Sequence, residues 1–140
     1  MGQTQSAIKI GFEDMQYSVK HLEENLIINT LDTTEQNCLI KGTLTASQEE
    51  DIVNKYLISQ MRKIRVIIYG RNCNDEKIYI KYKQFFSLGF SNIYIYTGGL
   101  FEWLLLQDIY GMDEFPTTSK QNDIIKYKPN KILGVPLLEY

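Results

Sequence analysis

Residues 64–69 read IRVIIY, and this near-continuous β-branched run decides the fold class. A strand that is covered on both faces lacks apolar–polar alternation, so the run predicts a central strand of a parallel sheet. The polar loop GRNCNDE (residues 70–76) follows, and then a stretch with helical apolar spacing that reaches Gly89. We therefore expect a strand, a loop and a helix in succession, with Asn74 or Asp75 capping the helix and Gly89 ending it.

Similar segments lie on both sides of this unit. Residues 26–31 (LIINTL) and 92–96 (NIYIY) are short apolar runs that predict further strands. Residues 47–50 (SQEE) have the form of a capping box and precede apolar residues at helical spacing. After the last run, a Gly-Gly turn leads into another helix. The alternation predicts a single three-layer α/β domain, with a mostly parallel sheet between helices and its functional edge where the strands end.

Composition and charge narrow the class of protein. With 140 residues, 44% of them hydrophobic, the chain is large enough to bury a core without a metal or disulfide. A net charge of −2 gives no field that attracts nucleic acid, so we expect no nucleic-acid partner. We also expect no membrane span and no secretory leader. Two cysteines indicate a reducing compartment, which predicts a cytoplasmic protein.

The chain divides into three expected parts. These are an N-terminal arm (residues 1–21), the α/β domain (residues 22–109) and a C-terminal extension (residues 110–140). We expect the extension to wrap back onto the domain, the alternative being a frayed end. Its expected apolar anchors are Ile124, Ile125, Tyr127 and Leu137.

The first six residues, MGQTQS, fit the acceptor pattern for N-myristoylation. Removal of Met1 would expose the amine of Gly2, and Ser6 stands where the pattern needs a hydroxyl. The alternative is a plain polar arm. One acyl chain gives only weak, reversible membrane binding, so peripheral membrane association is expected only if Gly2 is acylated. Lys9 and Lys20 are too sparse to serve as a second attachment signal.

Residues 88–103 read LGFSNIYIYTGGLFEW, with a Gly-Phe pair, a short strand, a Gly-Gly pair and a tryptophan in succession. At this spacing the four features resemble the second half of rhodanese-like domains. In the first half, residues 38–43 (CLIKGT) match the family's motif at Ile40 and Gly42. The resemblance covers about residues 22–108 and implies the rhodanese-like fold.

Active members of this family are sulfurtransferases. The resemblance therefore implies a cysteine directly after the central strand, which carries sulfur as a persulfide while loop amides and a helix N-terminus stabilise its anion. This chain departs from the pattern, since Gly70 holds that position and the loop thiol is Cys73. Asp75 and Glu76 follow closely, and carboxylates oppose a second negative charge. Arg71 is the candidate anion stabiliser.

We therefore favour a non-catalytic binding or scaffold module with an unknown protein partner. The competing hypothesis is a sulfurtransferase of the thiosulfate type, with Cys73 as nucleophile and a small sulfur-containing anion held by the loop. A phosphatase-like site is a distant third. The residues of the predicted active loop are Gly70, Arg71, Asn72, Cys73, Asn74, Asp75 and Glu76.

The sequence indicates neither a cofactor nor a metal site. His21 is the only histidine, and its distance in sequence from Cys38 and Cys73 does not fit a zinc site. Cys38 is flanked by Leu39 and Ile40, so we expect it to be a small core residue.

Overall fold

The computed structural model describes residues 7–134 of the chain. Gly2 and Ser6 of the predicted acylation signal, and the predicted anchor Leu137, lie outside the described residues. The elements in order are β1 (Ile8–Ile10), α1 (Phe12–Lys20), β2 (Asn25–Asn29), η1 (Thr33–Glu35), α2 (Ala46–Ile58), β3 (Arg65–Tyr69), α3 (Lys77–Ser87), β4 (Asn92–Tyr96), α4 (Gly99–Tyr110) and η2 (Ile124–Tyr127).

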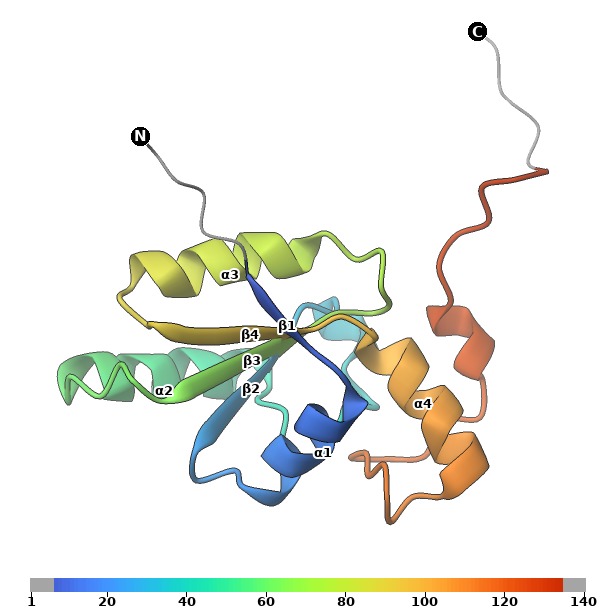
Figure 1. Cartoon of the computed structure of the whole chain (residues 1–140), viewed down its shortest axis with the longest axis horizontal. Coiled ribbons are helices and arrows are strands. Elements are labelled where there is room, and N and C mark those ends of the chain that lie inside the picture. Colours follow the sequence, from blue (N-terminus) through green and yellow to red (C-terminus); the bar gives the residue numbers. More distant parts are fainter. Residues whose placement is uncertain (1–6, 135–140) are drawn as a thin grey trace, which may run out of the picture.

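The four strands form one parallel sheet in the order β1-β4-β3-β2 (Figure 1). β3 pairs with β2 and β4 along its whole length, so that Ile67 lies between Ile27 and Tyr94. Every position of β3 after the first is buried. The β-branched run is thus the interior strand that its composition predicts.

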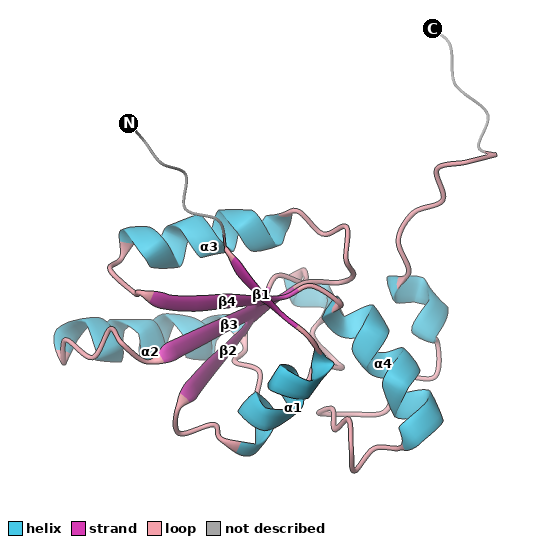
Figure 2. Cartoon of the chain, in the orientation of Figure 1, coloured by secondary structure: helices cyan, strands magenta, loops and turns pink. Residues whose placement is uncertain are grey.

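Two hydrophobic layers cover the two faces of the sheet, because successive side chains of a strand point to opposite faces. One layer contains Ile27 and Tyr96 and lies under α1 and α4. The other contains Ile28 and Ile93 and lies under α2 and α3. The sheet therefore lies between two pairs of helices, which confirms the predicted three-layer α/β architecture (Figure 2).

Residues 8–20 of the expected N-terminal arm are part of this architecture. β1 pairs with β4, with Ile8 opposite Tyr94, and α1 buries Met15 and Val19 in the core. The boundary expected at residue 22 therefore falls after the first strand and helix of the domain. The signal in the sequence was weak, because β1 has only three residues with a lysine in the middle.

Residues next to the helix ends determine where α2 begins and where α3 ends. α2 begins with a capping box two residues earlier than predicted: the Thr45 backbone N–H donates to Gln48 Oε1 (3.0 Å), and the Gln48 N–H donates to Thr45 Oγ1 (3.4 Å). The predicted box at residues 47–50 is wrong, because T-x-x-Q satisfies the same pattern earlier in the chain. Gly89 does follow α3 as predicted, with a φ of +97°. The N–H groups of Gly89 and Phe90 bond to carbonyls in the last turn.

The C-terminal extension packs on the layer under α1 and α4 up to Tyr127, as predicted, whereas residues 131–134 are exposed. Thr117 bridges to Ile40, and the Trp103 indole N–H donates to the Pro116 carbonyl (3.0 Å). Of the expected anchors, Tyr127 is buried and Ile124 is half-buried, but Ile125 is 58% exposed. The expectation for Ile125 is therefore wrong, because η2 turns that side chain away from the core.

Cys38 lies in the same layer and is buried, as expected for a core residue. Its Sγ donates to the Ser119 carbonyl oxygen (3.2 Å), which ties the first half of the chain to the C-terminal extension.

Candidate functional site

The loop of residues 70–76 leaves the sheet at the end of β3, beside the ends of β2 and β4. The start of α4 closes one side of it, because the Leu100 N–H donates to the Gly70 carbonyl oxygen (2.9 Å). Gly99 makes this approach possible. Its φ is +68°, and a Cβ there would lie 2.8 Å from the same carbonyl oxygen. The Gly-Gly pair of the sequence therefore seats α4 on the loop.

The Asp75 carboxylate occupies the inside of the loop. Its Oδ2 accepts hydrogen bonds from the Thr30 hydroxyl (2.9 Å) and the Arg71 backbone N–H (3.0 Å). Its Oδ1 accepts one from the Lys77 N–H (3.0 Å), at the start of α3. This last bond satisfies the first N–H of α3, but the N-cap residue is Glu76, whereas the sequence predicted Asn74 or Asp75. The hydrogen bonds from Thr30 and Arg71 show that these two donors already bind an anion, the carboxylate of Asp75 in the loop itself.

Gly70, directly after β3, has no room for a side chain. A Cβ built on Gly70 would lie 2.5 Å from Asp75 Oδ2 and 2.7 Å from its Cγ. Real Cβ atoms do not come this close to their neighbours, so a larger residue at this position would need the Asp75 carboxylate to move. This is the position at which the resemblance implies the nucleophile.

Cys73 lies on the outside of the loop. Its side chain is exposed, and its Sγ contacts Asn74 Oδ1 at 3.8 Å. Within residues 7–134, no backbone N–H donates a hydrogen bond to this sulfur. The loop amides therefore do not surround the candidate nucleophile.

Arg71 is bound to parts of the chain far from Cys73. Its guanidinium pairs with the Glu35 carboxylate after β2 and donates to the Lys126 carbonyl oxygen. Its Cζ also lies 5.1 Å from the centre of the Tyr127 ring, within the range of a cation–π contact. The candidate anion stabiliser is thus engaged by a carboxylate, a carbonyl and an aromatic ring.

Of the remaining loop residues, Asn72 and Asn74 are held by hydrogen bonds. Asn72 is buried and donates to the Tyr127 carbonyl oxygen (2.9 Å), while its Oδ1 accepts from the Asn74 N–H (2.9 Å). Glu76 precedes α3 and is exposed, with no side-chain capping bond. Together with Arg71, Asn72 fixes the loop to η2, so the C-terminal extension helps to hold the loop in place.

A hollow of about 660 Å³ lies beside the loop. It is bounded by the loop and the start of α3 on one side and by residues 128–132 on the other. Its charged side chains are of both signs, among them Glu76, Lys77 and Lys128. Its position at the carboxyl edge of a parallel sheet is where α/β proteins usually bind ligands.

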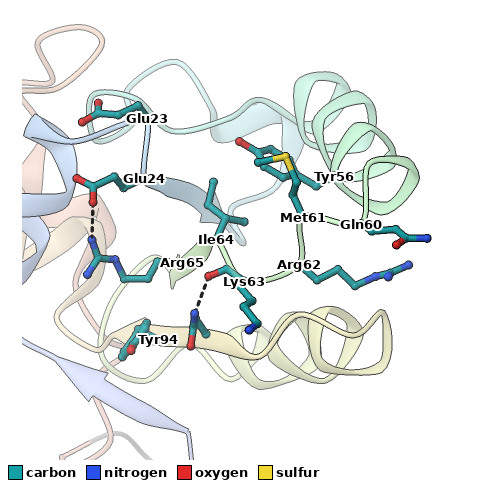
Figure 3. A pocket seen from close by; sticks show the side chains of 11 residues that line it. Glu23, Glu24, Tyr56, Gln60, Met61, Arg62, Lys63, Ile64, Arg65 and Tyr94 are labelled. Carbon is teal, nitrogen blue, oxygen red and sulfur yellow. Dashed lines mark hydrogen bonds and ion pairs between the residues drawn. The ribbon is translucent and has the colours of Figure 1, made fainter.

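A second hollow, of about 700 Å³, lies at the opposite edge of the sheet (Figure 3). Opposite charges pair inside it, with Arg65 and Glu24 at 3.7 Å. The Asn92 side chain donates to the Lys63 carbonyl oxygen (2.6 Å). This hollow shares no residue with the loop, and we assign no function to it.

Two tyrosines end the inner strands. The Tyr69 hydroxyl accepts a hydrogen bond from the Ile40 N–H (3.1 Å) and shares one with Thr43 Oγ1 (2.8 Å). The Tyr96 hydroxyl donates to Glu102 Oε1 (2.6 Å). Burial raises the pKa of both hydroxyls far above the ordinary range, and the Glu102 carboxylate adds to the effect on Tyr96. Both tyrosines stay protonated at neutral pH, where they join the strands to neighbouring segments.

Residues 7–134 contain neither a cluster of metal-binding side chains nor a membrane-spanning helix. No group of three His, Cys, Asp or Glu side chains gathers there to hold a metal ion. None of the helices in that range combines the length and the apolar character needed to cross a bilayer.

Sequence reasoning missed three partners of the loop: Thr30, Glu35 and the backbone of η2. Thr30 has a detectable signal, because it lies near the end of a predicted strand (residues 26–31) and parallel strands end at the same edge. Glu35 has no such signal, since it lies in the short η1 turn. The role of Asp75 was predicted only in part, as a helix cap and as a source of charge repulsion.

Comparisons with known proteins bear on the fold. No protein-family model matches the sequence, and no curated protein matches it. The rhodanese-like domain of the Anabaena sp. Alr3790 protein superposes with a TM-score of 0.56 and 20% identity, over 96% of this chain and 94% of its own. The single-domain sulfurtransferase RDL2 of Saccharomyces cerevisiae gives 0.54 and 14% identity, over 78% of this chain and 98% of its own.

A third structure, the thiosulfate sulfurtransferase of Pseudomonas aeruginosa, gives a TM-score of 0.57 at 14% identity. The match covers 86% of this chain but 23% of that chain. At these identities the comparisons concern the fold, and they confirm that the chain has the rhodanese-like fold that residues 88–103 predict.

Proposed function

We propose that this chain is a rhodanese-like domain without sulfurtransferase activity, which acts in the cytoplasm as a binding or scaffold module. The observation that carries the proposal is the Asp75 carboxylate. It lies against Gly70 and takes up hydrogen-bond donors beside the position where the family resemblance implies the nucleophile. A persulfide at residue 70 would have to displace this carboxylate, and two negative charges in one site repel each other.

The surroundings of Cys73 support the same proposal. Persulfide transfer through Cys73 needs donors that stabilise a sulfur anion. The Cys73 Sγ contacts a side-chain oxygen, and the Arg71 guanidinium is engaged by Glu35 and by η2. Sulfur transfer by Cys73 is the competing hypothesis, and it is tested directly.

The test uses thiosulfate as the sulfur donor and cyanide as the acceptor. After incubation with thiosulfate, intact mass should show no added sulfur on the wild-type chain, and cyanide should yield no thiocyanate. The Cys73→Ala variant is the matched control. A gain of one sulfur atom by the wild type that is absent from Cys73→Ala would overturn the proposal.

A pair of variants tests the physical reason. Gly70→Cys places a thiol against the Asp75 carboxylate, whereas Gly70→Cys with Asp75→Gly places it in a loop whose donors are free. We expect persulfide formation in the double variant only, with folding of both variants checked by circular dichroism. Equal reactivity of the two variants would mean that Asp75 does not block this position.

We also propose that the module is held at a membrane through an acyl chain on Gly2. The support is the myristoylation pattern of residues 1–6. Co-expression with an N-myristoyltransferase should add one myristoyl mass to the wild type and none to Gly2→Ala. An unchanged wild-type mass would refute the proposed acylation of Gly2. It would not bear on the proposal that the domain is a binding module without sulfurtransferase activity.

A further inference from the structure

The charge of the chain is unevenly distributed. Residues 120–134 contain four lysines and one acidic residue, Asp123, a net charge of +3. The whole chain carries −2, so the rest of it carries −5. All four lysines are exposed, and none of them pairs with a carboxylate within the described residues. The C-terminal segment is therefore a basic surface on an otherwise acidic protein.

The same segment exposes large aliphatic side chains. Ile132 is 76% exposed and Leu133 is 85% exposed, and Ile125 in η2 is also mostly in water. In Figure 1 residues 128–134, which follow η2, run away from the sheet rather than over it. Exposed aliphatic side chains among lysines are the combination with which peripheral segments enter the boundary between lipid headgroups and acyl chains.

The middle of the segment is attached to the domain through Tyr127. Tyr127 is buried, and its carbonyl oxygen and ring contact Asn72 and Arg71 of the loop. Lys128 and Ile132 follow this anchor and border the hollow beside the loop. The fold thus presents the basic and aliphatic side chains from a fixed point.

We propose that residues 120–134 bind a membrane surface that carries anionic lipid headgroups. A single myristoyl chain holds a protein only marginally, and a basic segment is one of the second signals that make the attachment stable. Lys9 and Lys20 near the N-terminus do not supply such a signal, but the C-terminal segment does. The inference rests on the proposed function only in that the acyl chain on Gly2 supplies one attachment to the membrane. The other attachment, through residues 120–134, does not depend on acylation.

The test measures partitioning of the acylated full-length chain onto phosphatidylcholine vesicles with and without phosphatidylserine. Each lysine near an anionic membrane strengthens binding by about fivefold. The triple substitution of Lys120, Lys128 and Lys131 to Gln should therefore weaken binding to the anionic vesicles about a hundredfold and leave binding to the neutral vesicles unchanged. Lys126 is kept, because its Nζ lies 5.1 Å from the Tyr127 ring centre.

A matched control removes the same charge elsewhere. The triple substitution of Lys20, Lys55 and Lys83 to Gln affects exposed lysines on α1, α2 and α3, and should bind as the wild type does. For the aliphatic side chains, Ile132→Ser with Leu133→Ser should weaken binding on the order of tenfold. Its control is Ile58→Ser with Ile109→Ser, at positions that are also mostly exposed.

Two results would overturn the inference: equal binding of the wild type to the two kinds of vesicle, or equal losses in the two triple lysine variants. Failure of the acylation is a separate outcome. If Gly2 is not acylated, the unmodified chain is compared with its Lys120, Lys128 and Lys131 variant on anionic vesicles at low salt. The wild type should still bind more tightly, and the same affinity for both would refute the basic segment as a lipid-binding surface.

Discussion

Replacement of Asp75 by alanine removes the acceptor of three hydrogen bonds inside the loop, those from Thr30, Arg71 and Lys77. A hydrogen bond to a charged group contributes about 1.5–3 kcal/mol. Asp75 is only half-buried, and water can reach part of the vacated space, so the total must fall well below the sum of three such bonds. We expect Asp75→Ala to lower the free energy of unfolding by about 2–4 kcal/mol.

Urea unfolding followed by circular dichroism measures this loss. With a slope of about 1–3 kcal/mol per molar urea, the midpoint should fall by about 0.7–4 M. Glu76→Ala is the matched control, because this neighbouring carboxylate is exposed and makes no side-chain capping bond. Its effect should stay within about 0.5 kcal/mol. Equal midpoints for the two variants would refute the reasoning that the loop is organised around Asp75.

Three further predictions concern the supports of the loop and the core. Gly99→Ala should lower the free energy of unfolding by about 2–4 kcal/mol, because the residue has a positive φ and its Cβ would clash with the Gly70 carbonyl oxygen. Gly111→Ala is the control: its φ is +104°, but no atom lies within 4 Å of the added Cβ, so it should lower the free energy of unfolding by only about 1 kcal/mol. Tyr127→Ala should lower it by about 3–5 kcal/mol in the same urea assay, while Ile125→Ala should change it little. Trp103, the one tryptophan and fully buried, should shift its fluorescence to longer wavelength only when the core unfolds; an early shift would mean that α4 detaches first.

The parts of the fold that could be predicted from the sequence have local causes. The run at residues 64–69 needs two covered faces to bury its side chains, and a central strand of a parallel sheet provides them. Gly89 can end a helix at a positive φ without strain. In contrast, both Thr45 and Ser47 begin a valid capping pattern, and local sequence alone does not choose between them.

The candidate site was predicted as a location but not as an arrangement. The loop follows the central strand, which places it at the functional edge of the sheet. Its contacts come from distant segments, since Thr30 is 45 positions from Asp75, and Asn72 is 55 positions from the Tyr127 carbonyl that it bonds. Such pairings depend on how the elements pack, and no periodicity or short motif encodes them.

The hydrogen bonds from Arg71 and Asn72 to the backbone of η2 have a consequence for synthesis on the ribosome. Chains emerge from the N-terminus, and domains usually fold as they become available. When β4 and α4 have emerged, the sheet has all its strands, yet Arg71 and Asn72 still lack the backbone carbonyls of residues 126 and 127. A nascent chain at this stage exposes the loop in an unfinished form, which gives chaperones and proteases a brief opportunity that ends when the last segment arrives.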